Sequence, residues 1–301
     1  MEVNASQVLL KAYFHHPNDP RDRLGTEFGF STFAWLNGLR TLPRPLACQP
    51  ENHLGLYEFI EGRRLEPHEV MADAVEQAAD FFHRLNRYKE APAASALPIA
   101  SEACFSLTEH LHCVERRLQN LQRMNESSNI NREAARFTRN ELSAVWEEVR
   151  HSVHRCDVVF DKRLNRGDWC LSPSDFGFHN AILTPIGRLR FIDFEYAGWD
   201  DPAKMVCDFF CQVALPAPME GFERFAGTVV SGLSGPTDHL ERIALLMPVY
   251  QLKWCCILLN NFLPIGRARR QFADEETDPN EQKVNQLRLA RALLTKVSRN
   301  A

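Results

Sequence analysis

The order of apolar and polar residues divides the chain into a mixed N-terminal part, a helical middle part, a short segment of turns and strands, and a helical C-terminal part. Residues 7–14 (QVLLKAYF) and 54–60 (LGLYEFI) are rich in aliphatic and aromatic side chains, which favours strands. Between them, apolar residues over 24–39 recur at helical spacing, and Pro43 and Pro45 end this predicted helix. The N-terminal part is therefore predicted to be mixed α/β.

The middle and C-terminal parts are predicted to be mainly helical. Over residues 66–166, Pro67 opens a helix at its first turn, where proline is tolerated, and apolar residues then recur at helical spacing. Further helices are predicted at about 107–124 and 131–164, and the chain returns to helices over 201–301.

The segment between these helical parts has a different pattern. Ala181-Ile182-Leu183 is a short apolar stretch, Pro185-Ile186-Gly187 is typical of a turn, and residues 189–194 (LRFIDF) form a second apolar stretch. This pattern predicts strand, turn and strand, with acidic residues at the ends.

Composition places the chain among ordinary globular proteins. It has 301 residues, of which 45% are hydrophobic and 25% are charged, and this length predicts about two domains or lobes. The formal net charge is −4, which argues against a nucleic-acid-binding protein. The nine cysteines form no CxxC pair, so we expect reduced thiols.

No membrane segment is expected. The first 30 residues lack the long apolar run of a signal peptide. The most apolar later stretch, residues 245–263, contains Gln251, Lys253, Asn260 and Asn261, so we interpret it as a core helix. We expect a cytoplasmic protein without a membrane partner.

Two clusters of polar residues carry the candidate chemistry. Asp175 is followed five positions later by Asn180, and Asp193 comes at the end of the second predicted strand. One carboxylate can orient or deprotonate a hydroxyl, while an amide oxygen and a second carboxylate can ligate Mg²⁺, which prefers oxygen ligands. These groups are typical of phosphoryl transfer.

The same residues carry a resemblance to a known family. Asp175-Phe176, Asn180, the Ile192–Glu195 segment (IDFE) and Asp201-Pro202 resemble the catalytic core of the aminoglycoside phosphotransferase and choline kinase superfamily. That pattern is roughly H-G-D-x-x-x-x-N, then [IV]-D-[FW]-[ED], then G-D-P; Pro173 and Ser174 stand here in place of its His and Gly. The resemblance implies a two-lobed, protein-kinase-like α+β fold and ATP-dependent phosphorylation of a hydroxyl on a small molecule.

The resemblance also implies roles for individual residues. Asp175 corresponds to the catalytic base, and Asn180 and Asp193 correspond to the ligands of Mg²⁺. Lys11 corresponds to the strand lysine that grips the ATP phosphates, and Glu27 to its ion-pair partner on the next helix.

A further part of the resemblance concerns the adenine site and the lobes. Glu58, Phe59 and Ile60 correspond to the hinge whose backbone binds adenine, and Glu195 corresponds to a residue that assists the metal indirectly. We expect a nucleotide-binding N-lobe over residues 1–62 and a C-lobe with the catalytic loop and acceptor site over 63–301.

The N-lobe is expected to be truncated. Only ten residues precede Lys11, whereas the family has a two-strand hairpin there, with a loop that covers the phosphates. We therefore expect the true start of the gene to lie upstream of Met1.

Several alternatives stay open from sequence. Asp175 can serve as a turn cap, Asp193 as a solvated strand end, Lys11 as a surface lysine, and Glu27 as a first-turn helix acid. Arg267, Arg269 and Arg270 either contact an anionic substrate or form a solvated basic loop.

Two other functions compete with a kinase. One is a non-catalytic, kinase-like binding protein, and the other is a metal-dependent hydrolase that uses Asp175, His179 and Asp193. The acceptor is open among sugars, amino alcohols and antibiotics.

Overall fold

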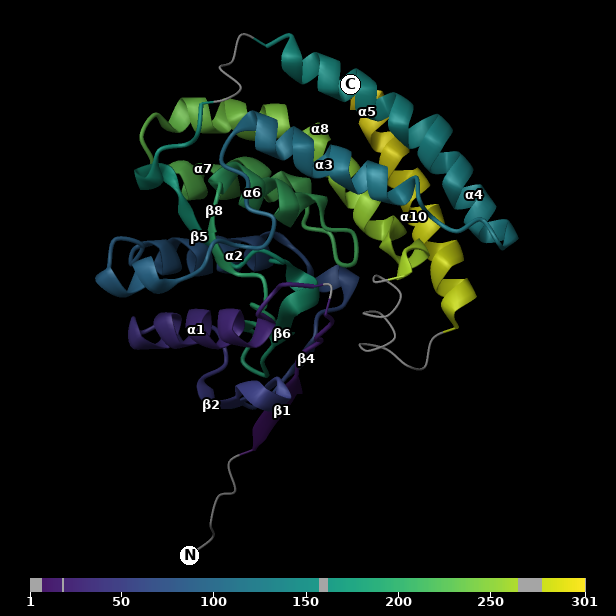
Figure 1. Ribbon diagram of the computed structural model, residues 1–301. Helices are drawn as coiled ribbons and strands as arrows, with labels where there is room; N and C mark the ends of the chain where they lie inside the picture. The colour runs from purple at the N-terminus through teal and green to yellow at the C-terminus, as the bar shows by residue number, and fades with distance from the viewer. Residues whose placement is uncertain (1–6, 18, 157–161, 265–277, 301) are drawn as a thin grey trace, which may run out of the picture. The chain divides into compact units, whose positions relative to one another are not determined.

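The computed structural model describes residues 7–17, 19–156, 162–264 and 278–300. The described chain divides into two compact units, one formed by residues 1–103 and 165–240 and the other by residues 104–164 and 241–301. Figure 1 follows both units from the N-terminus to the C-terminus. This division does not coincide with the expected lobe boundary after residue 62, which stays a prediction.

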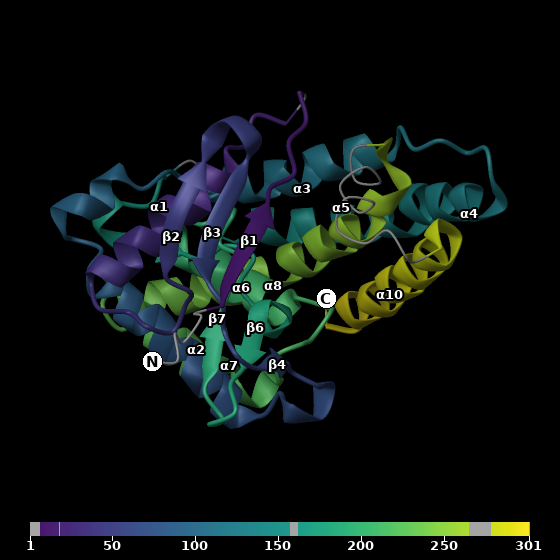
Figure 2. The same cartoon turned by 90° about the horizontal axis from the view of Figure 1, so that it is seen from below.

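A three-stranded antiparallel sheet opens the first unit. The strands β1 (Val8–Ala12), β2 (Pro45–Gln49) and β3 (Leu54–Glu58) lie in the order β1-β3-β2, with β1 at one edge (Figure 2). Helix α1 (Arg23–Leu36) contacts β2 and β3. Two of these strands and the helix confirm the predictions from the apolar pattern.

Strand β2 was not predicted, because Pro43 and Pro45 were interpreted as the end of a helix. Pro45 lies opposite Tyr57 at the start of the strand, and the register shifts directly after it. A proline is tolerated at the first position of a strand or beside such an irregularity, because its missing N–H is not needed there.

Helix α2 (Ala72–Asn86) begins later than predicted. Pro67 opens only a short 3-10 turn, η2 (Pro67–Glu69), and the helix starts after it. The apolar residues of α2 that recur at helical spacing are buried, as predicted: Val75, Ala78, Ala79, Phe82 and Leu85.

Short strands follow in the same unit. β6 (Ala181–Leu183) and β7 (Leu189–Phe191) form the predicted antiparallel pair, joined through a turn in which Gly187 has a φ of 75°. Three more strands were not predicted because none has a continuous apolar run in its sequence: β4 (Arg63–Arg64), β5 (Cys170–Ser172) and β8 (Gly198–Asp200). β4 extends the β6–β7 pair, and β5 pairs with β8.

The remaining helices of the first unit follow the strands or connect them. They are α6 (Pro202–Cys211), α7 (Phe222–Val230) and the 3-10 turns η1 (Pro50–Asn52), η3 (Pro92–Ala96), η5 (Arg166–Asp168), η6 (Phe178–Asn180) and η7 (Met219–Gly221). Helix α7 packs against α2 and α6.

Aromatic side chains form the core around the segment with the candidate chemistry. The ring of Phe81 on α2 lies 5.6 Å from Phe176, 5.0 Å from Phe191 and 6.0 Å from Phe194, measured between ring centroids. Phe30 on α1 lies 5.1 Å from Phe194. All five rings are buried, so the loops before β6 and after β7 are fixed to two helices.

The second unit is helical. Its elements are α3 (Leu107–Leu121), α4 (Asn129–Phe137), the π-helical turn η4 (Thr138–Leu142), α5 (Ser143–His154), most of α8 (Pro236–Leu258), η8 (Leu259–Phe262) and α10 (Pro279–Asn300). The helix predicted over 131–164 is instead interrupted at η4, where Ser143 Oγ donates to the Thr138 carbonyl, and α5 ends at His154.

One helical stretch, Pro236–Phe262, is long and apolar enough to cross a membrane by length and composition. Of its most apolar window, 61% is buried inside the protein, which fits the expected core helix. The cysteines form no disulfide in the structure; seven are buried, Cys156 is partly exposed and Cys48 is exposed.

Candidate active site

Lys11 joins two acidic residues from distant parts of the chain. Its Nζ lies 2.6 Å from Glu27 Oε2 and 2.5 Å from Asp193 Oδ1. The ion pair predicted between Lys11 and Glu27 is present, whereas the contact with Asp193 was not predicted. Burial by itself would lower the pKa of Lys11, but the carboxylates of Glu27 and Asp193 outweigh it and raise that pKa.

Local structure explains how β1 and α1 place this pair. Lys11 lies opposite Gly55 in the β1–β3 ladder. Helix α1 begins at a cap in which the Asp22 side chain accepts a hydrogen bond from the Gly25 N–H. Glu27 follows in the next turn and is buried, with only 4% of its surface exposed.

A second set of contacts joins the other three candidate residues. Asn180 Nδ2 donates to the Asp175 carbonyl at 2.9 Å, and the Ile192 N–H donates to the Asn180 carbonyl at 2.9 Å. Asp193 follows Ile192 directly, so Asp175, Asn180 and Asp193 lie at one end of the β6–β7 pair. The structure therefore brings together all five residues expected for catalysis, metal binding and phosphate binding.

Two residues of this segment adopt the left-handed backbone conformation. Ser174, just before Asp175, has a φ of 66°, and Asp193 has a φ of 68°. Positive φ is uncommon for residues other than glycine, and such positions often occur at active sites. The regular strand β7 ends at Phe191, earlier than predicted, and the Asp193 carboxylate beyond it contacts Lys11.

Glu195 belongs to a different ion-pair group. Its Oε1 lies 3.3 Å from Arg23 Nε, and Arg23 Nη2 also lies 2.6 Å from Asp19 Oδ2. Burial by itself would lower the pKa of Arg23, but its partners raise that pKa. The sequence patterns did not identify Arg23 or Asp19, because their contact with Glu195 depends on tertiary structure.

The residues expected to bind adenine lie at the end of β3, the strand that pairs with the strand of Lys11. Glu58 ends β3, and its Oε2 accepts hydrogen bonds from Arg190 Nη2 and the Arg44 N–H, both at 3.0 Å. The Phe59 N–H donates to the Gln7 carbonyl at 3.4 Å, and 45% of Phe59 is exposed. Ile60 is partly exposed.

The oxygens available to a cation come from Asn180 and Asp193. Asn180 uses its Nδ2 for the Asp175 carbonyl, which leaves Oδ1 as an acceptor, and Asp193 uses Oδ1 for Lys11, which leaves Oδ2. A hard divalent ion fits these two groups together with phosphate oxygens. Among the residues that the structure describes, no group of three or more His, Cys, Asp or Glu could hold a metal. Of the residues named by the hydrolase hypothesis, His179 Nε2 lies 3.4 Å from Asp175 Oδ1.

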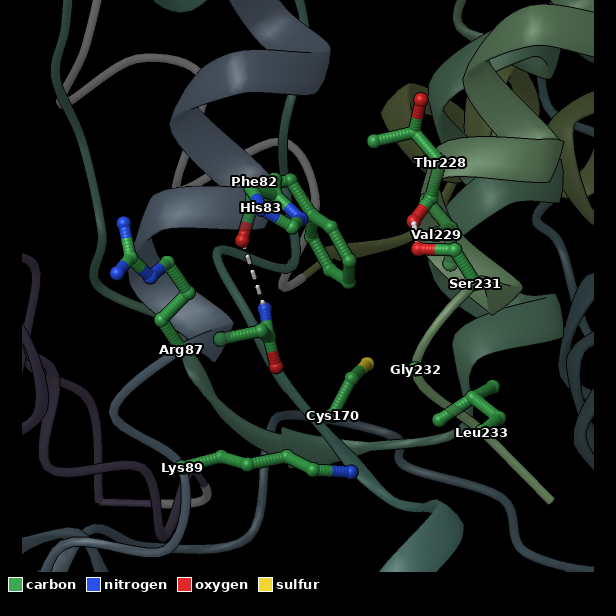
Figure 3. A pocket seen from close by; sticks show the side chains of 11 residues that line it. Phe82, His83, Arg87, Lys89, Cys170, Thr228, Val229, Ser231, Gly232 and Leu233 are labelled. Carbon is green, nitrogen blue, oxygen red and sulfur yellow. Dashed lines mark hydrogen bonds between the residues drawn. The ribbon is translucent and has the colours of Figure 1, made fainter.

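Two cavities lie elsewhere in the first unit, beside α2 and α7. One has a volume of about 180 Å³ and is lined in part by Phe82, Lys89, Cys170 and Leu233 (Figure 3). Lys89 runs along one side of it, and its Nζ donates to the Gly167 carbonyl at 2.6 Å. The other has a volume of about 300 Å³. Neither is lined by a candidate site residue.

Arg267, Arg269 and Arg270, which were considered as contacts to an anionic substrate, lie outside the described residues.

Comparison with solved structures defines the class of fold. A choline/ethanolamine kinase family protein from Mesorhizobium loti has a TM-score of 0.57 and 15% identity, covering 95% of this chain and 82% of that one. Choline kinase LicA from Streptococcus pneumoniae has a TM-score of 0.57 and 16% identity, with coverages of 97% and 87%. A Plasmodium vivax ethanolamine kinase has a TM-score of 0.59 and 14% identity, covering 97% of this chain and 77% of that one. The two-lobed, kinase-like α+β fold is thereby confirmed.

A family comparison adds the enzyme class. The model of the phosphotransferase enzyme family matches residues 7–246, so this chain belongs to that family. The predicted family and the predicted class of enzyme, a phosphotransferase, are confirmed. No match was found among curated proteins.

Proposed function

We propose that this phosphotransferase moves the γ-phosphoryl group of ATP, as its Mg²⁺ complex, to a hydroxyl of a small molecule. The observation that supports this most directly is the continuous set of contacts at the site. Lys11 bridges Glu27 and Asp193, and Asn180 connects the loop of Asp175 to the residue before Asp193. These contacts gather the groups that phosphoryl transfer requires.

Each residue has a defined task in this proposal. Asp175 accepts the proton of the acceptor hydroxyl and orients its oxygen toward the γ-phosphorus. Lys11, held by Glu27, binds the α- and β-phosphates. Asn180 and Asp193 hold Mg²⁺, which neutralises phosphate charge when bound. Since phosphoryl transfer needs little covalent chemistry from the protein, positioning and charge stabilisation account for most of the catalysis.

The remaining expectations belong to the same proposal. The backbone of Glu58, Phe59 and Ile60 binds adenine, residues 1–62 form the nucleotide-binding lobe, and residues 63–301 supply the acceptor site. The partner is a small molecule that carries a hydroxyl, rather than nucleic acid or membrane, and the location is cytoplasmic.

The direct experiment measures ADP release from ATP with a panel of sugars, amino alcohols and aminoglycoside antibiotics. We expect at least one acceptor to give Mg²⁺-dependent release that Asp175→Asn abolishes. Nucleotide binding without release on any acceptor would favour the non-catalytic binding protein. Phosphate release from a phosphoester without ATP would favour the hydrolase.

A further inference from the structure

Tyr13 contacts both members of the Lys11–Glu27 ion pair. Its hydroxyl donates to Glu27 Oε2 at 2.9 Å, and the same oxygen lies 2.6 Å from Lys11 Nζ. The Lys11 ammonium also lies over the Tyr13 ring, 4.7 Å from its centroid. One buried side chain therefore touches the carboxylate through its hydroxyl and the ammonium through its ring.

The hydrogen bonds around Tyr13 have a defined direction. Its hydroxyl lies 2.7 Å from the hydroxyl of Tyr57, and Tyr57 is buried beside it. Tyr13 gives its single hydroxyl proton to Glu27 Oε2, so Tyr57 must donate to Tyr13. Burial and the charge of Glu27 raise the pKa of Tyr13, which keeps this donor protonated.

Glu27 depends on these donors because it is almost completely buried. Within the described part of the chain, the donors to its carboxylate are Lys11 and Tyr13. Lys11 is at the same time drawn toward Asp193, 2.5 Å away. Without the Tyr13 hydroxyl, the carboxylate would keep Lys11 as its donor but lose one of its two hydrogen bonds, and hydrogen bonds to charged groups are among the stronger ones. The position of Glu27 would then depend on a lysine that a second acid also attracts.

We propose that Tyr13 is a positioning residue for nucleotide binding, which fixes Glu27 and thereby holds the Lys11 ammonium where the ATP phosphates bind. This inference rests on the proposed function, because it assigns the support of that same phosphate site. Tyr13 itself touches no reacting atom.

The test compares two variants that each remove one hydroxyl from the same buried cluster. Tyr13→Phe keeps the ring under Lys11 but removes the donor to Glu27, and Tyr57→Phe leaves that donor in place. We expect Tyr13→Phe to raise the Kd of Mg²⁺-ATP about tenfold and Tyr57→Phe to raise it less than about threefold, because a hydrogen bond to a buried charge typically accounts for a factor of this size. Thermal unfolding verifies that both variants are folded at the temperature of the titration.

A second comparison separates positioning from a general structural effect. Tyr13→Phe should not weaken nucleotide binding further in a Glu27→Gln background, because a residue that acts through Glu27 loses its effect when that charge is removed. Replacement of Tyr13 by 4-aminophenylalanine keeps the ring and a donor, and should restore the Kd to within about threefold of the unmodified protein. This variant also provides a folded probe if Tyr13→Phe unfolds.

Three outcomes overturn the inference. The first is an equal loss of Mg²⁺-ATP affinity in Tyr13→Phe and Tyr57→Phe. The second is an undiminished loss of affinity when Tyr13→Phe is added to Glu27→Gln. The third is a folded 4-aminophenylalanine variant whose affinity is not restored; each of the three is sufficient alone. If the unmodified protein does not bind Mg²⁺-ATP at all, the proposed function fails, and this inference fails with it.

Discussion

At the scale of single residues, the site centres on an ammonium shared by two carboxylates. The sequence predicted the pair of Lys11 and Glu27 through a family resemblance, because one lies on a strand and the other on the following helix. It did not predict that Asp193 contacts the same ammonium, since these residues are far apart in the chain and meet only through tertiary structure. Tyr13 was also missed, although a residue two positions after Lys11 on an extended chain faces the same side.

Removal of the ammonium should affect both binding and stability. Lys11→Ala should weaken ATP binding, and it should lower the free energy of unfolding by about 2–4 kcal/mol because it leaves the buried Glu27 carboxylate without its counter-charge. Urea unfolding and nucleotide titration measure the two effects separately. The Lys11→Ala/Glu27→Gln double variant should recover stability without recovering ATP binding. If Lys11→Ala alone were as stable as the unmodified protein, the Glu27 carboxylate would not depend on Lys11 as its counter-charge.

The backbone at Ser174 predicts a substitution that raises the free energy of unfolding. Ser174 has a φ of 66°, where an L-residue is strained by about 1–2 kcal/mol and glycine is not. Ser174→Gly should therefore stabilise the protein by about 0.5–1 kcal/mol, once the greater flexibility of glycine in the unfolded chain is subtracted. Urea unfolding tests this, with Ser152→Gly on helix α5 as the control, which should destabilise instead. A destabilising Ser174→Gly would show that the left-handed backbone is not strained there.

At the scale of elements, apolar periodicity predicted the long elements better than the short ones. Strands β1 and β3, helix α1 and the β6–β7 pair were recognisable, because each has a clear apolar pattern. Strands β5 (CLS) and β8 (GWD) were not, since each is as short as β6 or β7 but contains Ser, Gly or Asp and shows no continuous apolar stretch. The interruption at η4 also left no signal in the apolar pattern of 131–164.

A buried carboxylate joins the 3-10 turn η5 to the loop before α8 and should make stability depend on pH. Asp168, at the end of η5, accepts hydrogen bonds from the Ser234 N–H at 2.8 Å and from Ser234 Oγ at 2.7 and 2.8 Å. Burial by itself would raise the pKa of Asp168, but these hydrogen bonds lower it below the usual 3.8. The stabilisation is therefore complete above the unfolded-state pKa and is lost as the pH falls through the lower pKa of the folded state.

The corresponding experiment measures the free energy of unfolding between about pH 6 and pH 3. Asp168→Asn should be less stable than the unmodified protein at pH 6, and the difference should shrink as the pH falls below about 4. Asp80→Asn, at a side chain that is 61% exposed, serves as the control and should show no such convergence. A difference that stays constant with pH would exclude the proposed role of the Asp168 charge.

At the scale of the whole molecule, all candidate site residues belong to one compact unit, although two distant parts of the chain build it. The motif around Asp175, Asn180 and Asp193 was sufficient to predict the family and the fold. The acceptor could not be predicted, because its recognition depends on side chains that no motif specifies.

The most direct test of the kinase assignment separates the two acids by role. Mg²⁺-dependent nucleotide affinity and ADP release are measured for the unmodified protein, Asp175→Asn and Asp193→Asn. Asp175→Asn should keep the nucleotide affinity and lower kcat by about 10²–10⁴-fold, as expected for a group that acts in the transition state. Asp193→Asn should lose the Mg²⁺ dependence of binding. Full turnover by Asp175→Asn, or unchanged Mg²⁺ dependence in Asp193→Asn, would contradict the assignment of these residues.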